Sequence, residues 1–390
     1  MLTRKLRIAI FGFRGIPHSY GGTEPFIVEM APRLVEKGHE VIVYCRRSLF
    51  RERPAFYKGV RLIYLPSIET KILATPTHSL FCALDVLFRG VDVVLVMNIV
   101  NALQCAILRL FGQEFAIMVD GQDWKRGKWG RLAKSYFYWC AKHIGKICPR
   151  GVITDAEGMR QIYLDEFNTP STCIASGANI EVSTQPEVVR QYGLEPFQYY
   201  LIASRLVPEN NAELIVKAFE QVHSNRLLAI AGTANYRSKF IERLKQTKDP
   251  RVRFLGHVPD REHMKELHCN AYAYVHGHSL GGINPSLLMA LGCGNCVLAL
   301  DTPFNQEPLQ GYGVLFPHDV SALARELQNI EDNPELAAQY RKRAPERIRE
   351  AYSWERITDQ YEEFFLRLAA GENAAVAHSR VTAADKEFKV

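Results

Sequence analysis

Long hydrophobic runs are missing from this chain of 390 residues. The best candidate, residues 93–111, is interrupted by Asn98, Asn101, Gln104 and Arg109, so we expect no membrane-spanning helix. An Asp-x-Asp pair is also missing, and no His, Cys, Asp or Glu residues have the spacing of a metal site, so we predict no catalytic metal. The nine cysteines are odd in number and scattered, which argues against a disulfide framework and favours a reducing, cytosolic compartment.

Positive charge is concentrated in the first half of the chain. Residues 1–180 carry 24 Lys and Arg against 15 Asp and Glu, whereas residues 181–390 carry 24 against 27. The excess is greatest in residues 121–150, where eight basic side chains and three of the four tryptophans accompany one acidic residue, Asp123. This asymmetry predicts an anionic partner for the first half. Nucleic acid is disfavoured because no recognition fold accompanies the basic segment.

Both halves of the chain alternate strand-like and helix-like segments. Residues 7–13 and 199–206 are apolar strands, and residues 24–38 and 211–222 are amphipathic helices. This alternation predicts the α/β class, with two Rossmann-like parallel-sheet domains whose strand ends face a cleft. We expect a first domain over 1–180, a linker over 181–197, a second domain over 198–350, a helix over 351–370 and a disordered tail over 371–390.

A glycine-rich loop follows the first predicted strand. Gly15, Gly21 and Gly22 lie between that strand and a helix, where glycine lets the backbone approach a phosphate closely. The loop is too long for a dinucleotide fingerprint, and the second strand ends at Arg46 and Arg47 instead of an acidic residue. An NADP-dependent oxidoreductase, with these arginines on the 2′-phosphate, therefore stays only as a minor alternative. An ordinary connecting loop is the other alternative.

The second predicted domain has its own phosphate-binding candidates. Arg205 stands at a strand end, where its planar guanidinium can hold a diphosphate, and Asn210 lies near the next helix start. Asn284 can cap a helix beginning at Pro285, which would direct backbone N–H groups and a positive dipole end toward an anion.

The segment before that helix holds two histidines. We expect His276 and His278 to point in opposite directions along a strand, so that one of them packs in the core. Neither has other metal ligands at suitable spacing. Cys293 and Cys296 have C-x-x-C spacing, but they lead into a buried strand, and we interpret both thiols as core residues.

The basic segment reads as an amphipathic helix with a preceding loop. Trp129, Leu132, Tyr136, Cys140, Ile144 and Ile147 recur at helical spacing and predict the side that packs on the sheet. Five residues before and around its start predict contact with an anionic membrane or a lipid pyrophosphate. These are Trp124, Lys125, Arg126, Lys128 and Trp129.

Together these motifs resemble a nucleotide-sugar glycosyltransferase of the GT-B fold. They are similar to glycosyltransferase family 4, and within it to the rhamnosyltransferase-like branch of bacterial capsule and cell-wall polysaccharide synthesis. The motifs that carry the resemblance span residues 14–24, 120–130, 204–211, 276–288, 301–307 and 353–364.

The resemblance implies a retaining sugar transfer without a cofactor, from a nucleotide diphosphate sugar to a lipid-linked glycan. It implies that the enzyme works on the cytoplasmic side of the cell membrane, and that the last helix crosses back to the first domain. Asp120 would lie near the reacting hydroxyl. Donor binding would fall to Gly15, Gly21, Gly22, Arg205, Asn210, Val258, His278, Gly282, Asn284, Ser286 and Glu307.

The chain departs from the wider family at two glutamate positions, which are Gly281 and Met289 here. The second glutamate normally accepts hydrogen bonds from the ribose, and a thioether is a poor substitute. Asn210 also replaces a lysine that is frequent in the family. Three alternatives stay open: weaker donor binding, a ribose contact from elsewhere such as Glu307, or a degenerate, non-catalytic subunit that binds a partner transferase or glycan.

Overall fold

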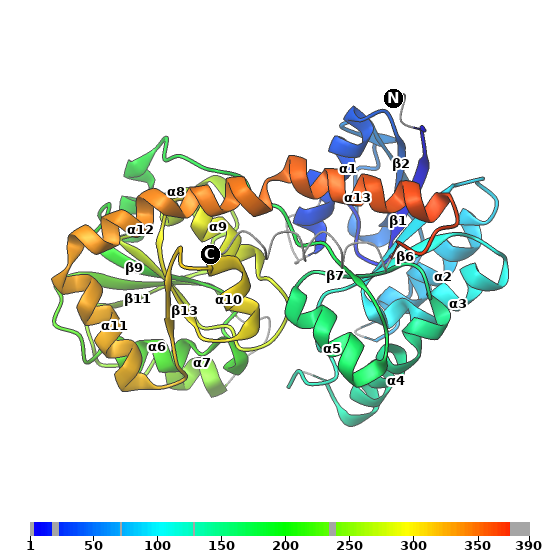
Figure 1. The fold of residues 1–390 in the computed structure, drawn as a ribbon. Helices are drawn as coiled ribbons and strands as arrows, with labels where there is room; N and C mark the ends of the chain where they lie inside the picture. Colours follow the sequence, from blue (N-terminus) through cyan, green and yellow to red (C-terminus); the bar gives the residue numbers. More distant parts are fainter. Residues whose placement is uncertain (1–3, 18–22, 71, 128, 234–238, 375–390) are drawn as a thin grey trace, which may run out of the picture. The chain divides into compact units, whose positions relative to one another are not determined.

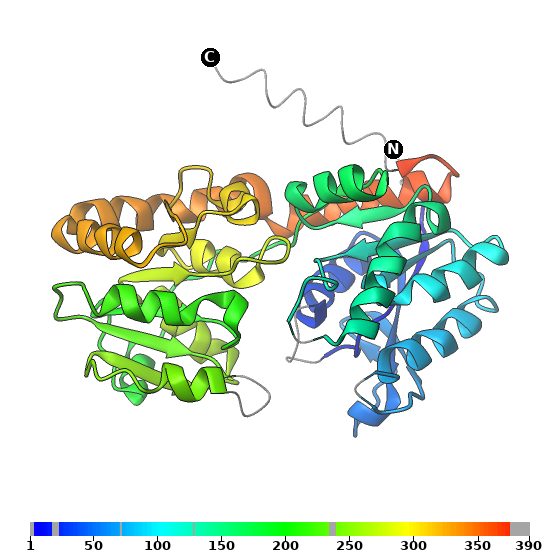
Figure 2. The same ribbon diagram turned by 90° about the horizontal axis from the view of Figure 1, so that it is seen from below.

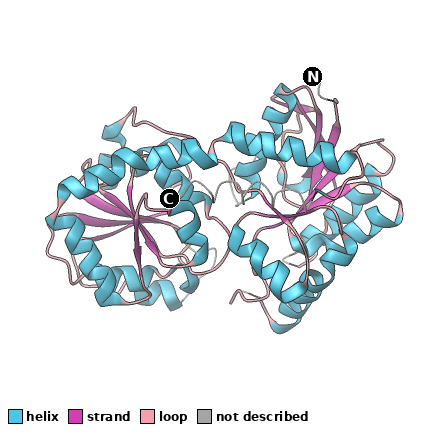
Figure 3. Cartoon of the chain, viewed as in Figure 1, coloured by secondary structure: helices cyan, strands magenta, loops and turns pink. Residues whose placement is uncertain are grey.

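The computed structural model describes residues 4–17, 23–70, 72–127, 129–233 and 239–374. The chain divides into two compact units. Unit 1 comprises residues 1–176 and 354–390, and unit 2 comprises residues 177–353. Each unit has one sheet covered by helices on both faces (Figures 1 and 3). The predicted pair of parallel-sheet α/β domains is therefore confirmed.

The sheet of unit 1 has eight strands in the order β3-β4-β2-β1-β5-β6-β7-β8. All neighbours pair in parallel except β3, which pairs antiparallel with β4. The central strands are continuously apolar because both faces are covered. The strands are β1 (Arg7–Phe11), β2 (Glu40–Arg46), β3 (Phe56–Tyr57), β4 (Val60–Leu65), β5 (Val93–Met97), β6 (Phe115–Val119), β7 (Val152–Thr154) and β8 (Thr172–Cys173).

The helices of unit 1 form two layers. Crossovers between parallel strands are right-handed. The chain builds the sheet outward from β1 in one direction and then outward from β5 in the other, so α1 covers one face of the sheet while α2, α3 and α4 cover the opposite face. The returning helix α13 packs beside α1, where the ring centroid of Phe26 lies 5.9 Å from that of Trp354 and 5.5 Å from that of Tyr361 (Figure 1). The predicted return of the last helix is thus confirmed. The helices are α1 (Thr23–Glu36), α2 (Ala74–Val86), α3 (Ala102–Leu110), α4 (Arg131–Ile147), α5 (Glu157–Phe167) and α13 (Trp354–Ala369), with short 3₁₀ turns η1 (Arg47–Leu49) and η2 (Ile99–Asn101).

Unit 2 has a fully parallel sheet in the order β11-β10-β9-β12-β13-β14. Its strands are β9 (Tyr199–Ala203), β10 (Leu227–Ala231), β11 (Val252–Gly256), β12 (Ala273–His276), β13 (Cys296–Leu300) and β14 (Val314–Phe316). Its α-helices are α6 (Ala212–Phe219), α7 (Lys239–Leu244), α8 (Arg261–Cys269), α9 (Pro285–Gly292), α10 (Pro303–Leu309), α11 (Val320–Asp332) and α12 (Pro334–Arg347). Three short helical turns complete it: η3 (Pro186–Tyr192), η4 (Pro208–Asn210) and η5 (Ile348–Tyr352).

The segment that leads into β9 is part of unit 2 and is anchored to α8 by Glu266. This buried carboxylate accepts hydrogen bonds from the hydroxyl of Ser183 (2.5 Å) and the backbone N–H groups of Thr184 (2.8 Å) and Gln185 (3.0 Å). Burial alone would raise the pKa of Glu266, but these hydrogen bonds outweigh it and hold the pKa at about 2. The segment is therefore fixed by a charged, desolvated anchor.

The two ends of unit 2 meet. The backbone N–H of Ala178 donates to the carbonyl of Tyr352 at 2.8 Å, and Ala178 and Ser353 form a parallel bridge. The chain thus enters and leaves unit 2 at one place.

All nine cysteines are free thiols, and all but the half-buried Cys173 are buried. Cys293 and Cys296 are among the buried ones, as predicted. No helix in the described part of the chain is long and apolar enough to span a bilayer.

Candidate functional site

The strand order of unit 2 reverses between β9 and β12. In open parallel sheets, ligands bind beyond the carboxyl ends of the strands at such a switch point. Arg205 lies two residues past β9, and His278 lies two residues past β12. The topology therefore brings two groups of sequence-predicted site residues to the same edge of the sheet.

The loops that follow β9 and β12 are joined by hydrogen bonds. Ser279 donates its N–H (3.1 Å) and its hydroxyl (2.8 Å) to the carbonyl of Glu209, and the Asn211 amide donates to the carbonyl of Gly277 at 2.7 Å. A Cβ atom on Gly277 would lie 2.5 Å from the carbonyl oxygen of Asn210, so only glycine allows this approach. The two loops form one framework.

Arg205 is exposed at the surface of this framework. Its guanidinium forms no ion pair with the residues that the structure describes. Asn210 is buried, and its amide donates to the carbonyl of Arg205 at 2.8 Å. The structure thus gives Asn210 a contact that fixes the backbone at Arg205 and leaves the guanidinium accessible.

The start of α9 is capped by Asn284, as the sequence predicts. Its Oδ1 accepts hydrogen bonds from the N–H (2.9 Å) and the hydroxyl (2.8 Å) of Ser286, and Pro285 has no N–H to offer. The cap therefore uses the N–H of Ser286, a residue that the resemblance assigns to donor binding, for a contact within the protein. The N–H groups just before the cap, from Gly281 to Ile283, have no hydrogen-bond partner within the described ranges, and they are the donors left for an anion.

The two histidines lie side by side. The rings of His276 and His278 are stacked, with centroids 4.2 Å apart and nearly parallel planes at an interplanar angle of 10°. The expectation of opposite directions is wrong because residues two apart in extended chain project to the same side. Burial and the neighbouring His278 keep the pKa of His276 well below its usual range, so its ring stays neutral.

Tyr274 is a site residue that sequence reasoning missed. Its buried hydroxyl lies within hydrogen-bonding distance of three atoms, Ser286 Oγ (3.1 Å), the Ala203 carbonyl oxygen (3.3 Å) and His276 Nδ1 (3.3 Å), and its single proton can be donated to one of them at a time. It therefore connects the end of β9 to the start of α9. The sequence could have indicated this residue, because Tyr274 and His276 are two positions apart on a strand and therefore share a face.

Asn305 is the second missed residue. Its amide bridges the carbonyls of His278 (3.0 Å) and Leu300 (2.8 Å), which ties the loop after β12 to the end of β13. The motif at 301–307 contained it, but only Glu307 was singled out there. Glu307 is half-buried on α10, and its carbonyl accepts from Arg347 at 2.9 Å.

The remaining candidates of unit 2 occupy different positions around this edge. Val258 is buried just after β11, and Gly282 is half-buried before the cap. Gly281 has a φ of 119°, a backbone conformation that a glutamate rarely adopts. Met289 is half-buried in the second turn of α9. The positive φ at position 281 thus explains why glycine replaces the family's glutamate there, whereas nothing in the structure explains Met289.

The glycine loop of unit 1 follows β1, where the strand order reverses between β1 and β5. A Cβ on Gly12 would lie 2.3 Å from the Met97 carbonyl, and one on Gly15 would lie 2.6 Å from the Cys45 sulfur. These two glycines therefore permit close packing of the loop on its neighbours. Gly21 and Gly22 lie outside the described residues.

Asp120 lies directly after β6 and is half-buried at the carboxyl edge of the unit 1 sheet. The following loop turns its tryptophans inward. Trp124 is buried against Phe167, at 5.5 Å between ring centroids, and the Trp129 indole donates to Asp123 at 3.2 Å. The expectation that Trp124 meets a membrane surface does not fit this packing.

The cations of this loop also have neighbours. Arg126 pairs with Asp123 at 3.3 Å, and exposed Lys125 approaches Glu166 at 3.5 Å. Lys128 lies outside the described residues. The predicted helix after the loop is α4, but Leu132, assigned to its packed side, is 90% exposed.

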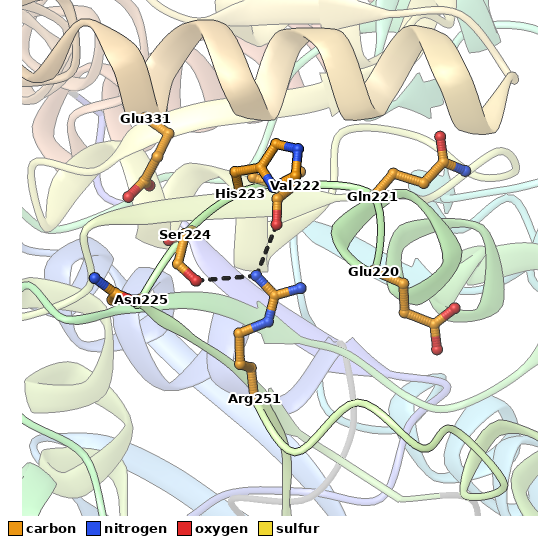
Figure 4. Close-up of a pocket in the computed structure, with 8 residues that line it drawn as sticks. All are labelled: Glu220, Gln221, Val222, His223, Ser224, Asn225, Arg251 and Glu331. Carbon is orange, nitrogen blue, oxygen red and sulfur yellow. Dashed lines mark hydrogen bonds between the residues drawn. The ribbon is translucent and has the colours of Figure 1, made fainter.

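A pocket of about 620 Å³ lies at the opposite edge of the unit 2 sheet, before β10 and β11 (Figure 4). Arg251 dominates it, but its guanidinium already donates to the carbonyls of Val222 (2.7 Å) and Ser224 (3.0 Å) and pairs with Asp249 (2.7 Å). Its hydrogen-bonding capacity is used for structure, so we assign this pocket no role. It is lined by Glu220, Gln221, Val222, His223, Ser224, Asn225, Arg251 and Glu331.

Among the described residues, no group of three or more His, Cys, Asp or Glu side chains could hold a metal ion. Metal independence of any activity stays a prediction.

Residues 185–347 match the family model described as "Glycosyl transferases group 1". Over this range, which lies within unit 2, the chain is similar to group 1 glycosyltransferases. The matched range includes the whole framework built on β9, β12 and α9. A comparison with curated protein sequences gives no match.

Solved structures that are similar over nearly the whole chain show the same architecture. Sucrose-phosphate synthase from Thermosynechococcus elongatus has a TM-score of 0.78 at 21% identity, with 95% of this chain and 100% of that chain covered. A glycosyltransferase from Rickettsia africae has a TM-score of 0.73 at 15% identity, with 94% and 99% covered. Anabaena Alr3699/HepE in complex with UDP-glucose has a TM-score of 0.72 at 15% identity, with 92% and 98% covered. Together with the two parallel-sheet units, these structures show that the fold of the chain is GT-B.

Proposed function

We propose that the protein is a retaining, metal-independent glycosyltransferase that moves a sugar from a nucleotide diphosphate to a lipid-linked glycan. Polysaccharide synthesis at the cytoplasmic side of the membrane is the process we infer, and rhamnose is the first sugar to test. The observation that carries the proposal is the match to group 1 glycosyltransferases over a range whose switch point carries accessible Arg205 and the N–H groups of residues 281–283 at the same edge of the sheet.

The chemistry of this edge suits a diphosphate leaving group. A guanidinium and backbone N–H groups stabilise the negative charge that develops as the sugar–phosphate bond breaks. In a front-face displacement, the departing diphosphate itself helps to take the proton of the acceptor hydroxyl. Such a reaction needs positioned donors more than a side-chain nucleophile. Asp120 of unit 1 is the residue we assign to the reacting hydroxyl.

A second candidate function rests on Met289. A thioether cannot accept the ribose hydrogen bonds that a carboxylate would, so a chain with this residue suits a non-catalytic subunit that binds a partner transferase or glycan. The variant Met289→Glu discriminates between the two. Higher nucleotide affinity in this variant supports a working donor site of reduced strength, and unchanged affinity favours the non-catalytic subunit.

Calorimetric titration with UDP, dTDP, GDP and NADP⁺, first without metal and then with Mg²⁺, tests the main proposal. We expect one sugar-carrying nucleotide to bind without metal and to name the base of the donor. Binding of NADP⁺ alone would instead support the oxidoreductase alternative, with Arg46 and Arg47. If no nucleotide binds, the donor site has been lost and the transferase proposal fails.

A further inference from the structure

Large hydrophobic side chains that remain exposed are concentrated on one part of unit 1. Of the twenty in the described part of the chain, twelve lie between residues 72 and 139, on or beside α2, α3 and α4. Unit 2 has four. These three helices lie next to one another on the face of the sheet opposite α1 and α13 (Figure 2). We call their solvent-facing side the apolar face.

The exposed residues of α2 form a continuous row. Leu80 (38% exposed), Leu84 (43%) and Phe88 (90%) follow one another at intervals of four residues, so they align on one side of the helix and its C-terminal extension. The core-facing side of the same helix is also apolar, with Cys82 and Val86 fully buried. The packing of the helix on its sheet therefore does not account for the hydrophobic side chains on its outer side.

Exposed hydrophobic residues also occur on the two neighbouring helices. Leu110 is 82% exposed and Phe111 is 66% exposed at the end of α3, and Leu132 is 90% exposed at the start of α4. Single exposed hydrophobic residues are ordinary, but their concentration on three adjacent helices is typical of an interaction surface.

Basic side chains outnumber acidic ones on these three helices. The sequences of α3 and α4 contain no Asp or Glu, whereas α4 carries Arg131, Lys134, Lys142 and Lys146. The acidic residue of α2, Asp85, is paired with Arg89. Leucine and phenylalanine flanked by basic side chains are typical of segments that lie at the interface of an anionic membrane.

We propose that the apolar face of α2, α3 and α4 docks unit 1 on an anionic lipid bilayer. This inference rests on the proposed function, because a lipid-linked acceptor places its sugar at the membrane surface. The proposed membrane contact is therefore made by solvent-exposed side chains of the apolar face. The loop at 124–129 does not make it, because the tryptophans of that loop are turned inward. The hydrophobic residues would enter the headgroup region while Lys142 and Lys146 contact lipid phosphates.

Sedimentation with vesicles of phosphatidylcholine, with and without phosphatidylglycerol, tests the docking surface on the full chain. We expect binding only to vesicles that contain phosphatidylglycerol. The double variant Phe88→Ser/Phe111→Ser should reduce binding by at least about tenfold, because two large apolar side chains no longer leave water on docking. Phe56→Ser is the matched control, since Phe56 is 62% exposed on β3 and lies outside the apolar face.

The double variant Lys142→Ala/Lys146→Ala tests the electrostatic part. Each lysine should contribute about a fivefold change in binding at low salt, and this difference should disappear at high salt. Lys248→Ala is the control, because Lys248 is an exposed lysine of unit 2.

Each of these results would overturn the inference: unchanged vesicle binding by the Phe88/Phe111 variant, equal binding to both lipid compositions, or a wild-type dimer in sedimentation velocity that this variant dissociates. The last result would assign the apolar face to a second copy of the chain. Nucleotide titration in solution, on the same variants, separates this inference from the proposed function. A chain that binds nucleotide but no vesicles refutes only the docking surface, and one that binds vesicles but no nucleotide refutes the proposed function.

Discussion

Replacing Arg205 by alanine separates donor binding from folding. The side chain is exposed and forms no ion pair with the described residues, so its removal should change the free energy of unfolding by no more than about 0.5 kcal/mol. The backbone at this position is held through its carbonyl by Asn210, and this contact survives the substitution. Any loss of nucleotide binding in Arg205→Ala therefore reports the guanidinium itself.

The expected loss follows from the hydrogen bonds that a guanidinium makes to a diphosphate. Charge-assisted hydrogen bonds contribute about 1.5 to 3 kcal/mol, which corresponds to roughly 10- to 150-fold in the dissociation constant. The effect should be confined to ligands with a β-phosphate, so UDP should lose affinity while UMP changes little. If dTDP or GDP proves to be the bound nucleotide, its own monophosphate replaces UMP.

Calorimetry with the diphosphate and the monophosphate on wild type and variant measures this difference. Arg253→Ala is a suitable control because Arg253 is an exposed arginine of the same unit, on strand β11. Equal loss for both nucleotides would contradict a β-phosphate contact. No loss for either would refute the assignment of Arg205 to the donor.

Three further predictions concern stability, the loop framework and metal. Glu266→Gln should lower the free energy of unfolding by about 3 kcal/mol at neutral pH, as measured by urea denaturation, because it removes a buried carboxylate that accepts several hydrogen bonds. The folded pKa of Glu266, about 2, is below its ordinary value, so its contribution to the free energy of unfolding is complete above about pH 5 and is lost as the pH falls toward 2. The free energies of unfolding of wild type and Glu266→Gln should therefore converge as the pH is lowered. Gly232→Ala should disturb the loop after β9, because a Cβ there would lie 1.8 Å from the Ser204 carbonyl oxygen, and thermal unfolding together with nucleotide titration should show both lower stability and lower affinity. Sugar transfer should persist in EDTA, and a complete loss that a divalent ion restores would contradict metal independence.

Periodicity predicted the fold because both sheets are built from short, continuously apolar parallel strands. Strands such as β1, β5 and β9 are buried on both faces, so their hydrophobic pattern is visible without knowledge of their neighbours. The cap at Asn284 was also predictable, because capping depends on the residue itself and on the next two positions.

The site was less predictable because its contacts depend on distant segments. The function of Asn210 as a backbone anchor, and of Asn305 as a bridge between two loops, follows from chain partners that no local pattern reveals. The same reason explains the error at Trp124. An aromatic residue in a basic segment resembles a membrane anchor until its neighbours on α5, such as Phe167, are known.

The meeting of the two ends of unit 2 has a consequence for synthesis of the chain on the ribosome. Unit 2 is inserted within unit 1, and α13, which covers Phe26 through Trp354 and Tyr361, is translated after unit 2 is complete. Residues 1–176 of unit 1 therefore remain without α13, with part of their core uncovered, while unit 2 is synthesised and folds. The order of translation makes unit 2 the first part that can finish folding and makes the final helix the closing step for unit 1.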